Sequence, residues 1–381
     1  MSSSNQPMEA LSTFRDDLIT PSVDNSKSSD GKIFNYKKYL KNQNTKSRKA
    51  VAFFTSLVLI VGLIMLSKVV HSSLTDNREE NGDDKPKSLD LRLYSHNIRY
   101  DNRNLERGEH LWSERKHLMT SSVKFHTESS GSSVIGLQEV LHGQLQDILE
   151  ILNYGNNDWT YYGVGRTDGK ESGEYAPILY KKSQWDLIGN RTFWLSETPD
   201  VPSIGWDSVL ERIVTMVTLR SVVSPSHTIN VFCTHFDHIG VVGRRESAKL
   251  IMDRMENFNE YPSFLLGDFN TEPKDEPYKI LKSHGIKDSR TLATSRESYG
   301  HDYTFTGWDI NKEANTIIDY IWSPSWSTNS TSIGVSTASG GSPTKYPRTS
   351  IQIKNFGVLH SHFGFYMSDH RPVVALYELK H

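Results

Sequence analysis

The sequence predicts an α/β fold in which two mixed β-sheets pack face to face and helices cover their outer faces. Strand-like segments outnumber helical ones in residues 88–381. Several of these strands also follow one another without an intervening helix, which favours two packed mixed sheets over a purely parallel sheet. One transmembrane helix is expected before this domain, over residues 50–70.

Residues 1–49 are rich in Ser, Asn, Asp and Lys. They show little apolar periodicity, and a segment of this kind lacks the apolar surface that would offset the entropy of folding. We therefore expect a disordered tail.

Residues 50–67 contain no charged side chain. As a helix they would span about 27 Å, close to the ~30 Å hydrocarbon core of a bilayer. Lys68 can extend its ammonium group to the interface, and the apolar residues 69–70 lengthen the span. The alternative is a buried core helix. A cleaved signal peptide would begin nearer the N-terminus.

The flanks of this segment predict its orientation. Residues 41–49 are basic and residues 76–84 are acidic. The positive-inside rule then places the N-terminal tail in the cytosol and the folded body in the lumen or outside the cell, as in a single-pass membrane protein. Residues 71–87 form a polar linker between span and body. The acceptor tripeptides at Asn190 and Asn329 fit glycosylation in that location.

The elements of the body follow in order from their apolar patterns. Leu89, Leu91 and Leu93 alternate with polar residues, as in a strand with one buried face. Helical spacing of apolar residues predicts helices at 112–125, 141–152 and 241–258. Short apolar runs predict strands at 134–137, 161–164, 177–180, 185–195, 213–222, 229–234, 264–266, 317–321 and 373–377. Residues 325–350, dominated by Ser, Thr, Gly and Pro, predict a long surface loop.

The charge distribution argues against a tight nucleic-acid binder. Of the 43 basic and 45 acidic residues, nine and five lie in residues 1–50, which leaves the rest of the chain with a net charge of −6. Proteins that bind nucleic acid tightly carry a basic excess on the binding domain. A local basic groove stays open as an alternative. Cys233 is the single cysteine, so no intrachain disulfide forms.

Polar side chains recur at the ends of the predicted strands. Taken singly, an Asp or Asn at such a position is usually a turn former, and a lone His is usually a hydrogen-bonded surface or core residue. Together, carboxylate, amide and imidazole groups delivered to one cleft are what metal-assisted attack on a phosphorus ester requires. The residues in question are Asn97, Glu139, His235, Asp268, Asn270, Asp319, Asp369 and His370.

The motifs around these residues resemble those of the endonuclease/exonuclease/phosphatase superfamily, which includes DNase I-like nucleases and phosphatases. They occur in the family's order and cover the body but neither the tail nor the membrane segment. The resemblance implies a four-layer α/β sandwich with its site at one edge of the paired sheets. The matching motifs are Ser95-His96-Asn97-Ile98, Leu137-Gln138-Glu139-Val140, Thr234-His235-Phe236-Asp237-His238, Gly267-Asp268-Phe269-Asn270, Ile318-Asp319-Tyr320-Ile321 and Ser368-Asp369-His370-Arg371-Pro372.

The resemblance also implies a metal site. Glu139 would be the main metal carboxylate, with Asn97 and Asp369 in or just outside the metal's shell. The implied ion is Mg²⁺, with Mn²⁺ as the alternative, because hard oxygen ligands suit both. Some nucleases of the superfamily carry an acidic residue two positions after the Asn of the first strand. Arg99 occupies that position here, which favours one metal ion.

The remaining residues take catalytic roles by the same resemblance. His370 would act on the attacking water or the phosphoryl oxygens, and Asp319 would orient its ring. Asp268 would position or deprotonate the water. Asn270 would donate to a phosphoryl oxygen, and His235 would support the phosphate or the leaving oxygen.

A glycine-rich, charged loop at residues 163–175 is a further candidate. Arg166 in this loop would bind a phosphate of the substrate as a bidentate donor. The alternative is a solvated loop with a spare cation. No Gly-Lys-Ser/Thr follows, so the loop is not a nucleotide-triphosphatase phosphate loop.

These observations predict a membrane-anchored, Mg²⁺-dependent phosphoesterase whose substrate is a small-molecule, sugar or lipid phosphoester. The fold hosts both phosphatases and nucleases, so an endo- or exonuclease is the first alternative. A catalytically inactive binding protein on the same fold is the second. An inactive relative would be expected to have lost at least one of the acidic or imidazole groups, and the set is intact here. The sequence indicates no protein partner and no oligomeric state.

Overall fold

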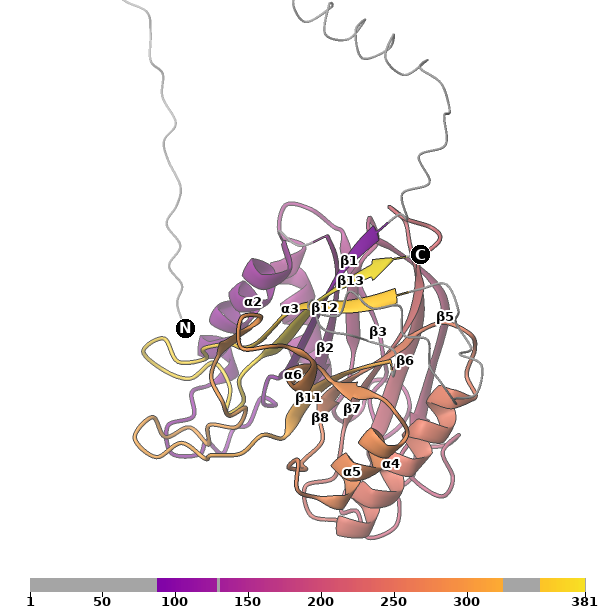
Figure 1. Ribbon diagram of the computed structural model, residues 1–381. Helices are drawn as coiled ribbons and strands as arrows, with labels where there is room; N and C mark the ends of the chain where they lie inside the picture. The colour runs from indigo at the N-terminus through magenta and orange to yellow at the C-terminus, as the bar shows by residue number, and fades with distance from the viewer. Residues whose placement is uncertain (1–87, 129–130, 325–349, 381) are drawn as a thin grey trace, which may run out of the picture. The chain divides into compact units, whose positions relative to one another are not determined.

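The computed structural model describes residues 88–128, 131–324 and 350–380, and this part of the chain forms two packed β-sheets with helices outside (Figure 1). The seven-stranded sheet has the order β10-β12-β13-β1-β2-β4-β3. Its strands are β10 (Ser298–Gly300), β12 (Ser350–Val358), β13 (Val373–Lys380), β1 (Ser88–Asn97), β2 (Ser132–Gln138), β4 (Ile178–Lys181) and β3 (Trp159–Tyr162).

The six-stranded sheet has the order β5-β6-β7-β8-β11-β9. Its strands are β5 (Trp185–Trp194), β6 (Ile213–Ser221), β7 (Thr228–His235), β8 (Ser263–Asp268), β11 (Asp319–Ser323) and β9 (Lys287–Asp288). The helices are α2 (Trp112–Glu128), α3 (His142–Leu152), α4 (Val241–Glu256), α5 (Glu276–Ser283) and α6 (Ser289–Leu292).

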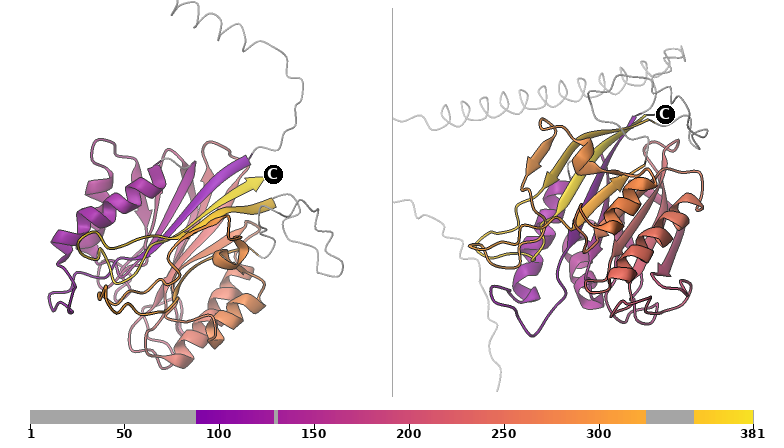
Figure 2. Two further views of the ribbon diagram at one scale, coloured as in Figure 1. Left: turned by 60° about the vertical axis from the view of Figure 1, so that its left-hand side comes forward. Right: turned by 60° about the horizontal axis from the view of Figure 1, so that its bottom comes forward.

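Three clusters of buried side chains separate four layers. The largest lies between the two sheets and includes Leu91 of β1 and Val231 of β7. A second joins the other face of the seven-stranded sheet to α2 and α3, and a third joins the other face of the six-stranded sheet to α4 and α5. Figure 2 shows the sheets enclosed by these helices. The prediction of two packed mixed sheets flanked by helices is confirmed.

The strands form where apolar side chains recur at every second residue. Phe264 and Leu266 of β8 enter the core between the sheets, whereas Leu265 packs against the outer helices. This alternation follows from the period of two in an extended strand. A strand buried on both faces is therefore apolar in its central residues, as β8 is at residues 264–266. The sequence pattern does not predict β12 or α5: α5 is only eight residues long and carries a Pro in its first turn.

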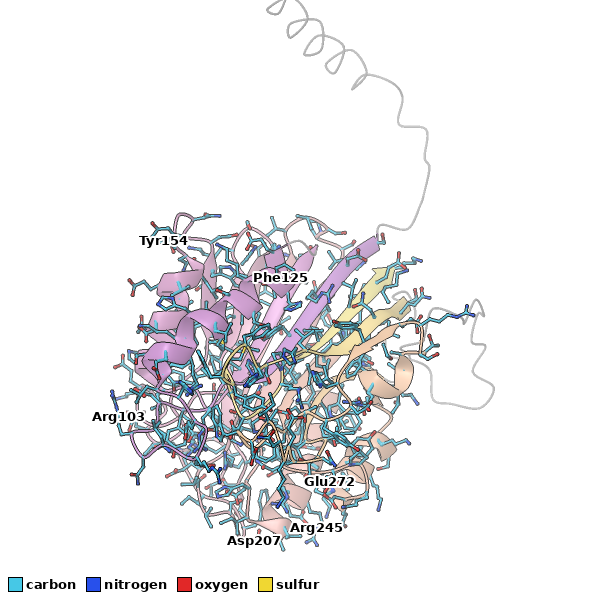
Figure 3. The ribbon with its side chains drawn as sticks, turned by 90° about the vertical axis from the view of Figure 1, so that its left-hand side faces the viewer. Arg103, Phe125, Tyr154, Asp207, Arg245 and Glu272 are labelled. Carbon is cyan, nitrogen blue, oxygen red and sulfur yellow. The ribbon has the colours of Figure 1, made fainter. Side chains whose placement is uncertain are left out.

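The strand directions decide where the functional residues gather. β1 runs parallel to β2, and β7 runs parallel to β8, so the carboxyl ends of all four strands lie at one edge of the sheets. β11 is antiparallel to β8 and β13 is antiparallel to β1, so both begin at that same edge. In Figure 3, Glu272, Arg245 and Asp207 lie at one end of the molecule, and the exposed Phe125 and Tyr154 lie at the other.

No helix within residues 88–128, 131–324 and 350–380 combines the length and the apolar character needed to cross a bilayer. The predicted tail (1–49), membrane span (50–70) and linker (71–87) lie outside the described residues, and so does Asn329. Asn190 lies on β5 with its side chain exposed.

Candidate active site

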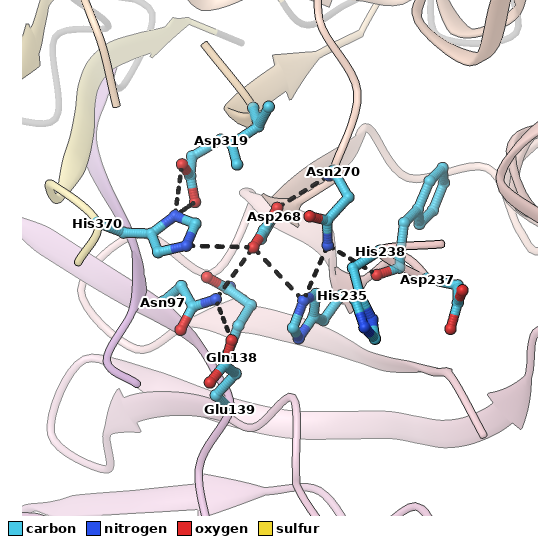
Figure 4. Close-up of polar contacts among 12 residues, drawn as sticks. Asn97, Gln138, Glu139, His235, Asp237, His238, Asp268, Asn270, Asp319 and His370 are labelled. Atoms are coloured by element: carbon cyan, nitrogen blue, oxygen red, sulfur yellow. Dashed lines mark hydrogen bonds and ion pairs between the residues drawn. The ribbon is translucent and has the colours of Figure 1, made fainter. Parts of the chain in front are cut away.

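The edge at which these strands meet carries most of the predicted site residues. Asn97, His235 and Asp268 are the last residues of β1, β7 and β8, and Asp319 is the first of β11. The strand register pairs Asp268 with both His235 and Asp319. Figure 4 shows their side chains converging, together with Glu139, Asn270 and His370.

Two of these residues depart from extended backbone. Glu139 has φ 60° and Asn270 has φ 45°. Asn tolerates this left-handed conformation, whereas Glu adopts it rarely. The chain therefore turns sharply immediately after β2, and this turn places the Glu139 carboxylate beside Asn97 rather than along the strand.

The Asn97 amide joins two carboxylates at the centre of the site. Its Nδ2 donates to Glu139 Oε1 at 2.9 Å and to Asp268 Oδ2 at 3.0 Å. Its Oδ1 accepts from the Arg99 backbone N–H at 3.0 Å, and this contact sets the amide orientation. The amide N–H groups of Asn97 thus face the carboxylates, which suits a role in positioning Glu139 from just outside a metal's shell.

His370 lies between two carboxylates. Its Nδ1 contacts Asp319 Oδ2 at 2.9 Å, and its Nε2 lies 3.7 Å from Asp268 Oδ2. Burial by itself lowers the pKa of His370, but the charges of Asp319 and Asp268 raise the pKa well above the ordinary value. The ring is therefore an imidazolium held by Asp319, with its Nε2–H directed toward the reaction centre.

The pKa values of the carboxyl groups at the site shift in different directions. Burial, with a contribution from the Asp319 charge, raises the pKa of Asp268 to about 7. Burial also raises the pKa of Asp369 to about 6, and the Glu139 charge adds to the effect. The pKa of Glu139 is lowered although burial opposes this, because Asn97 donates to it and Arg99 lies near. Asp268 is thus poised to exchange a proton near neutral pH.

His235 and Asn270 form the side of the site opposite His370. Asn270 Nδ2 donates to the Phe236 carbonyl at 3.0 Å, and it lies 3.1 Å from His235 Nε2. The carbonyl contact orients the amide, so His235 Nε2 accepts and the ring proton lies on Nδ1. Burial and the charges of Arg212 and Arg166 lower the pKa of His235, which keeps the ring neutral.

Several described groups have the chemistry to hold a metal ion. Asp268, Asp319 and His370 offer ligand atoms within 4.8 Å of one another. His370 Nδ1 already contacts Asp319 Oδ2 at 2.9 Å, so this ring offers an ion only its Nε2. Glu139 keeps free lone pairs on both carboxylate oxygens after accepting from Asn97 and from Tyr100 N–H. Glu139 is accordingly the stronger candidate ligand.

The structure places the other predicted residues near this centre but in different settings. Asp369 is buried, and its backbone oxygen accepts from Thr306 N–H at 2.6 Å. Arg166 is buried as well and donates to Glu174 Oε2 at 2.7 Å, rather than lying on a solvated loop with a free charge.

Two residues adjacent to the centre are absent from the sequence prediction. Glu174 Oε2 lies 3.9 Å from His235 Nδ1. Arg212 is buried; its Nε lies 3.5 Å from Asp237 Oδ2, and its Nη2 lies 3.1 Å from His238 Nδ1. Glu174 lies in the charged glycine-rich loop, and that location was the sequence feature from which it could have been identified as a site residue. Nothing local distinguishes Arg212, because its partners lie on the loop after β7.

The chain matches a family model and several known proteins. The model of the Endonuclease/Exonuclease/phosphatase family matches residues 94–370. The chain is also 23% identical over 211 residues to an uncharacterized protein of Acanthamoeba polyphaga mimivirus; the match covers 47% of this chain and only 30% of that protein.

Two solved structures give closer agreement. An endonuclease/exonuclease/phosphatase from Bacteroides vulgatus is 32% identical, with a TM-score of 0.62 over 76% of this chain and 99% of that chain. A Bacteroides thetaiotaomicron mannosyl-6-phosphatase is 29% identical, with a TM-score of 0.62 over 75% and 99% of the two chains. The predicted family resemblance is confirmed.

Proposed function

The chain belongs to the endonuclease/exonuclease/phosphatase family, and from this premise we propose that it is a Mg²⁺-dependent hydrolase of a small-molecule, sugar or lipid phosphoester. One observation carries the proposal: Asn97 ties Glu139 to Asp268, and Asp268 lies against His370, at the edge where six strands meet. The mannosyl-6-phosphatase among the similar structures supports a phosphomonoester as substrate.

The donor set fits a hard divalent cation. The half-buried Glu139 and the buried Asp268 both accept from Asn97, the Glu139 charge acts on the buried Asp369, and burial raises the pKa of Asp268 and Asp369. A cation offsets such charge, and oxygen donors suit Mg²⁺, or Mn²⁺ as the alternative. Glu139 would hold the ion, with Asp369 nearby. When bound, Mg²⁺ supplies electrostatic stabilisation of the phosphoryl oxygens.

The protein's own residues supply the proton transfer and the orientation. Asp268 accepts the proton of the attacking water, because its pKa near 7 suits that transfer at neutral pH. His370, charged and held by Asp319, donates from Nε2 to the developing negative charge on phosphorus oxygens. On the other side, His235 and Asn270 would support the phosphate or the leaving oxygen, and Asn270 would have to exchange its Nδ2 contact with Phe236 or His235 for one with the substrate.

A panel assay tests this function. The full-length chain with Mg²⁺ is presented with phosphomonoesters, phosphodiesters, DNA and RNA, before and after chelation. We expect metal-dependent turnover of a small phosphoester. Faster turnover of nucleic acid, with affinity that falls steeply as salt rises, would instead identify a nuclease. Binding without any hydrolysis would identify an inactive binding protein on this fold.

We also propose that residues 50–70 anchor the protein in a membrane with the catalytic domain on the lumenal or extracellular side. The support is the uncharged run at 50–67 and the basic-to-acidic change across it. Alkaline extraction of membranes tests the anchoring, and protease protection of separately prepared sealed vesicles tests the orientation. Release of the protein at high pH, or digestion of the catalytic domain from the cytosolic side, would contradict them.

A further inference from the structure

The glycine-rich loop at residues 163–175 is held in a defined conformation by hydrogen bonds. Arg166 N–H donates to the Glu174 carbonyl at 3.0 Å, and the Trp194 indole donates to the Arg166 carbonyl at 2.6 Å. A Cβ at Gly165 would overlap the backbone of Ser172, so the two arms of the loop approach as only glycine allows. These contacts hold the side chains of Arg166 and Glu174 side by side.

The loop places this ion pair next to the reaction centre. Glu174 Oε2 lies 3.9 Å from His235 Nδ1, and His235 Nε2 lies 3.4 Å from Asp268 Oδ2. A single imidazole ring therefore separates Glu174 from the proposed proton acceptor. The side chains of Arg166 and Glu174 are 10% and 15% exposed, so each is largely buried and keeps only a small solvent-accessible area.

A second ion pair lies near enough for the Arg212 charge to act on Glu174. Arg212 pairs with Asp237, and its Nη2 donates to His238 Nδ1. Because His238 accepts at Nδ1, its proton lies on Nε2, and burial together with the Arg212 charge lowers the pKa of this ring. The two arginines are thus balanced by two carboxylates. The group has no formal net charge, yet it offers both donors and acceptors.

We propose that Arg166, Glu174 and His238 bind hydroxyl groups of a neutral sugar or polyol that carries the scissile phosphate; this inference rests on the proposed function. A hydroxyl group both donates and accepts, which matches a guanidinium and a carboxylate held together. A second phosphate would find no unbalanced cation here and would approach Glu174 and Asp237. This charge balance would therefore disfavour bisphosphates and a nucleic-acid backbone.

Paired substrates with the same type of leaving group test the inference. The full-length chain is assayed with Mg²⁺ on a hexose 6-phosphate, on butyl phosphate, which lacks hydroxyl groups, and on a hexose 1,6-bisphosphate. For the native protein we expect kcat/KM for the hexose 6-phosphate to exceed both others at least tenfold. In Glu174→Gln the ratio of hexose 6-phosphate to butyl phosphate should fall about ten- to hundredfold, because a hydrogen bond to a charged group is lost.

Glu171→Gln is the matched control, because Glu171 lies exposed on the same loop and also loses one negative charge. Its substrate ratio should stay within about twofold of the native ratio. An unchanged ratio in Glu174→Gln, or an equal fall for both substrates, would overturn the inference. If the native protein hydrolyses none of the phosphoesters, the proposed function fails instead. Calorimetric binding of the hexose 6-phosphate and butyl phosphate then tests the pocket by itself, and equal affinities overturn it.

Discussion

Replacing Asp268 with Asn should abolish activity. It should also stabilise the protein relative to the native form, and this difference in the free energy of unfolding should grow as the pH rises. Asp268 is buried, and its pKa is raised from an ordinary 3.8 to about 7. A carboxyl group with a raised folded-state pKa is increasingly destabilising as pH rises above 3.8, because the unfolded chain ionises first. The penalty grows until about pH 7 and is then constant. Asp268→Asn removes this penalty.

The magnitude follows from the two pKa values. At 1.36 kcal/mol per pKa unit, the raised pKa of Asp268 lowers the free energy of unfolding by about 4 kcal/mol at pH 8 and by about 1.6 kcal/mol at pH 5. The substitution also places an amide against the Asn97 Nδ2 donor, at a cost of about 1–3 kcal/mol that does not depend on pH. Between pH 5 and pH 8, Asp268→Asn should therefore gain about 2–3 kcal/mol relative to the native protein.

Urea unfolding in the presence of a chelator measures this difference at both pH values. Asp186→Asn serves as the control, because that side chain is 54% exposed on β5, and its effect should stay within about 0.5 kcal/mol at each pH. A difference below about 0.5 kcal/mol for Asp268→Asn, or stabilisation that decreases with pH, would refute the reasoning. Turnover by the same variant should fall by about 10²-fold or more.

Three further predictions concern the metal, the imidazolium and the strand contact beneath the site. Chelation should abolish activity and Mg²⁺ should restore it; full activity in chelator would contradict the metal dependence. Glu139→Gln should weaken Mg²⁺ binding in calorimetry and reduce turnover by about 10²-fold or more. Asp319→Asn should move the alkaline limb of the pH–kcat profile to lower pH, because Asp319 raises the pKa of His370 and its loss lets the ring deprotonate sooner; an unmoved limb would exclude the pairing. Gly267→Ala should destabilise the fold by about 2 kcal/mol or more in urea unfolding. The reason is that Gly267 has φ 156° and a Cβ there would overlap the Thr234 carbonyl of the neighbouring strand. A thermal midpoint equal to that of the native protein would refute this prediction.

Much of the fold and of the site was accessible from the sequence. Apolar runs located most strands, and a polar residue at the end of a run located Asn97 and Asp268, whereas Asp319 was predicted inside the run at 317–321 and is the first residue of β11. These inferences succeed because side-chain alternation and strand termination are local properties of a few consecutive residues. The helix α5 and the strand β12 were not predicted, because their local sequence patterns are weak. The helix α5 is too short for a periodic signal, and β12 follows directly on the Ser-, Thr- and Gly-rich segment.

The sequence by itself determined which chemical groups stand at the strand ends, because that depends only on residue order. The tertiary structure alone decided how those groups meet: Asn97 Nδ2 at the end of β1 lies 3.0 Å from Asp268 Oδ2 at the end of β8, 171 residues further along the chain. It also decided that Arg166 is balanced by Glu174 rather than free for a phosphate, and that Asn97 turns its N–H groups toward the carboxylates. Charge balance, burial and hydrogen-bond direction depend on distances between remote segments, and sheet order and register set those distances.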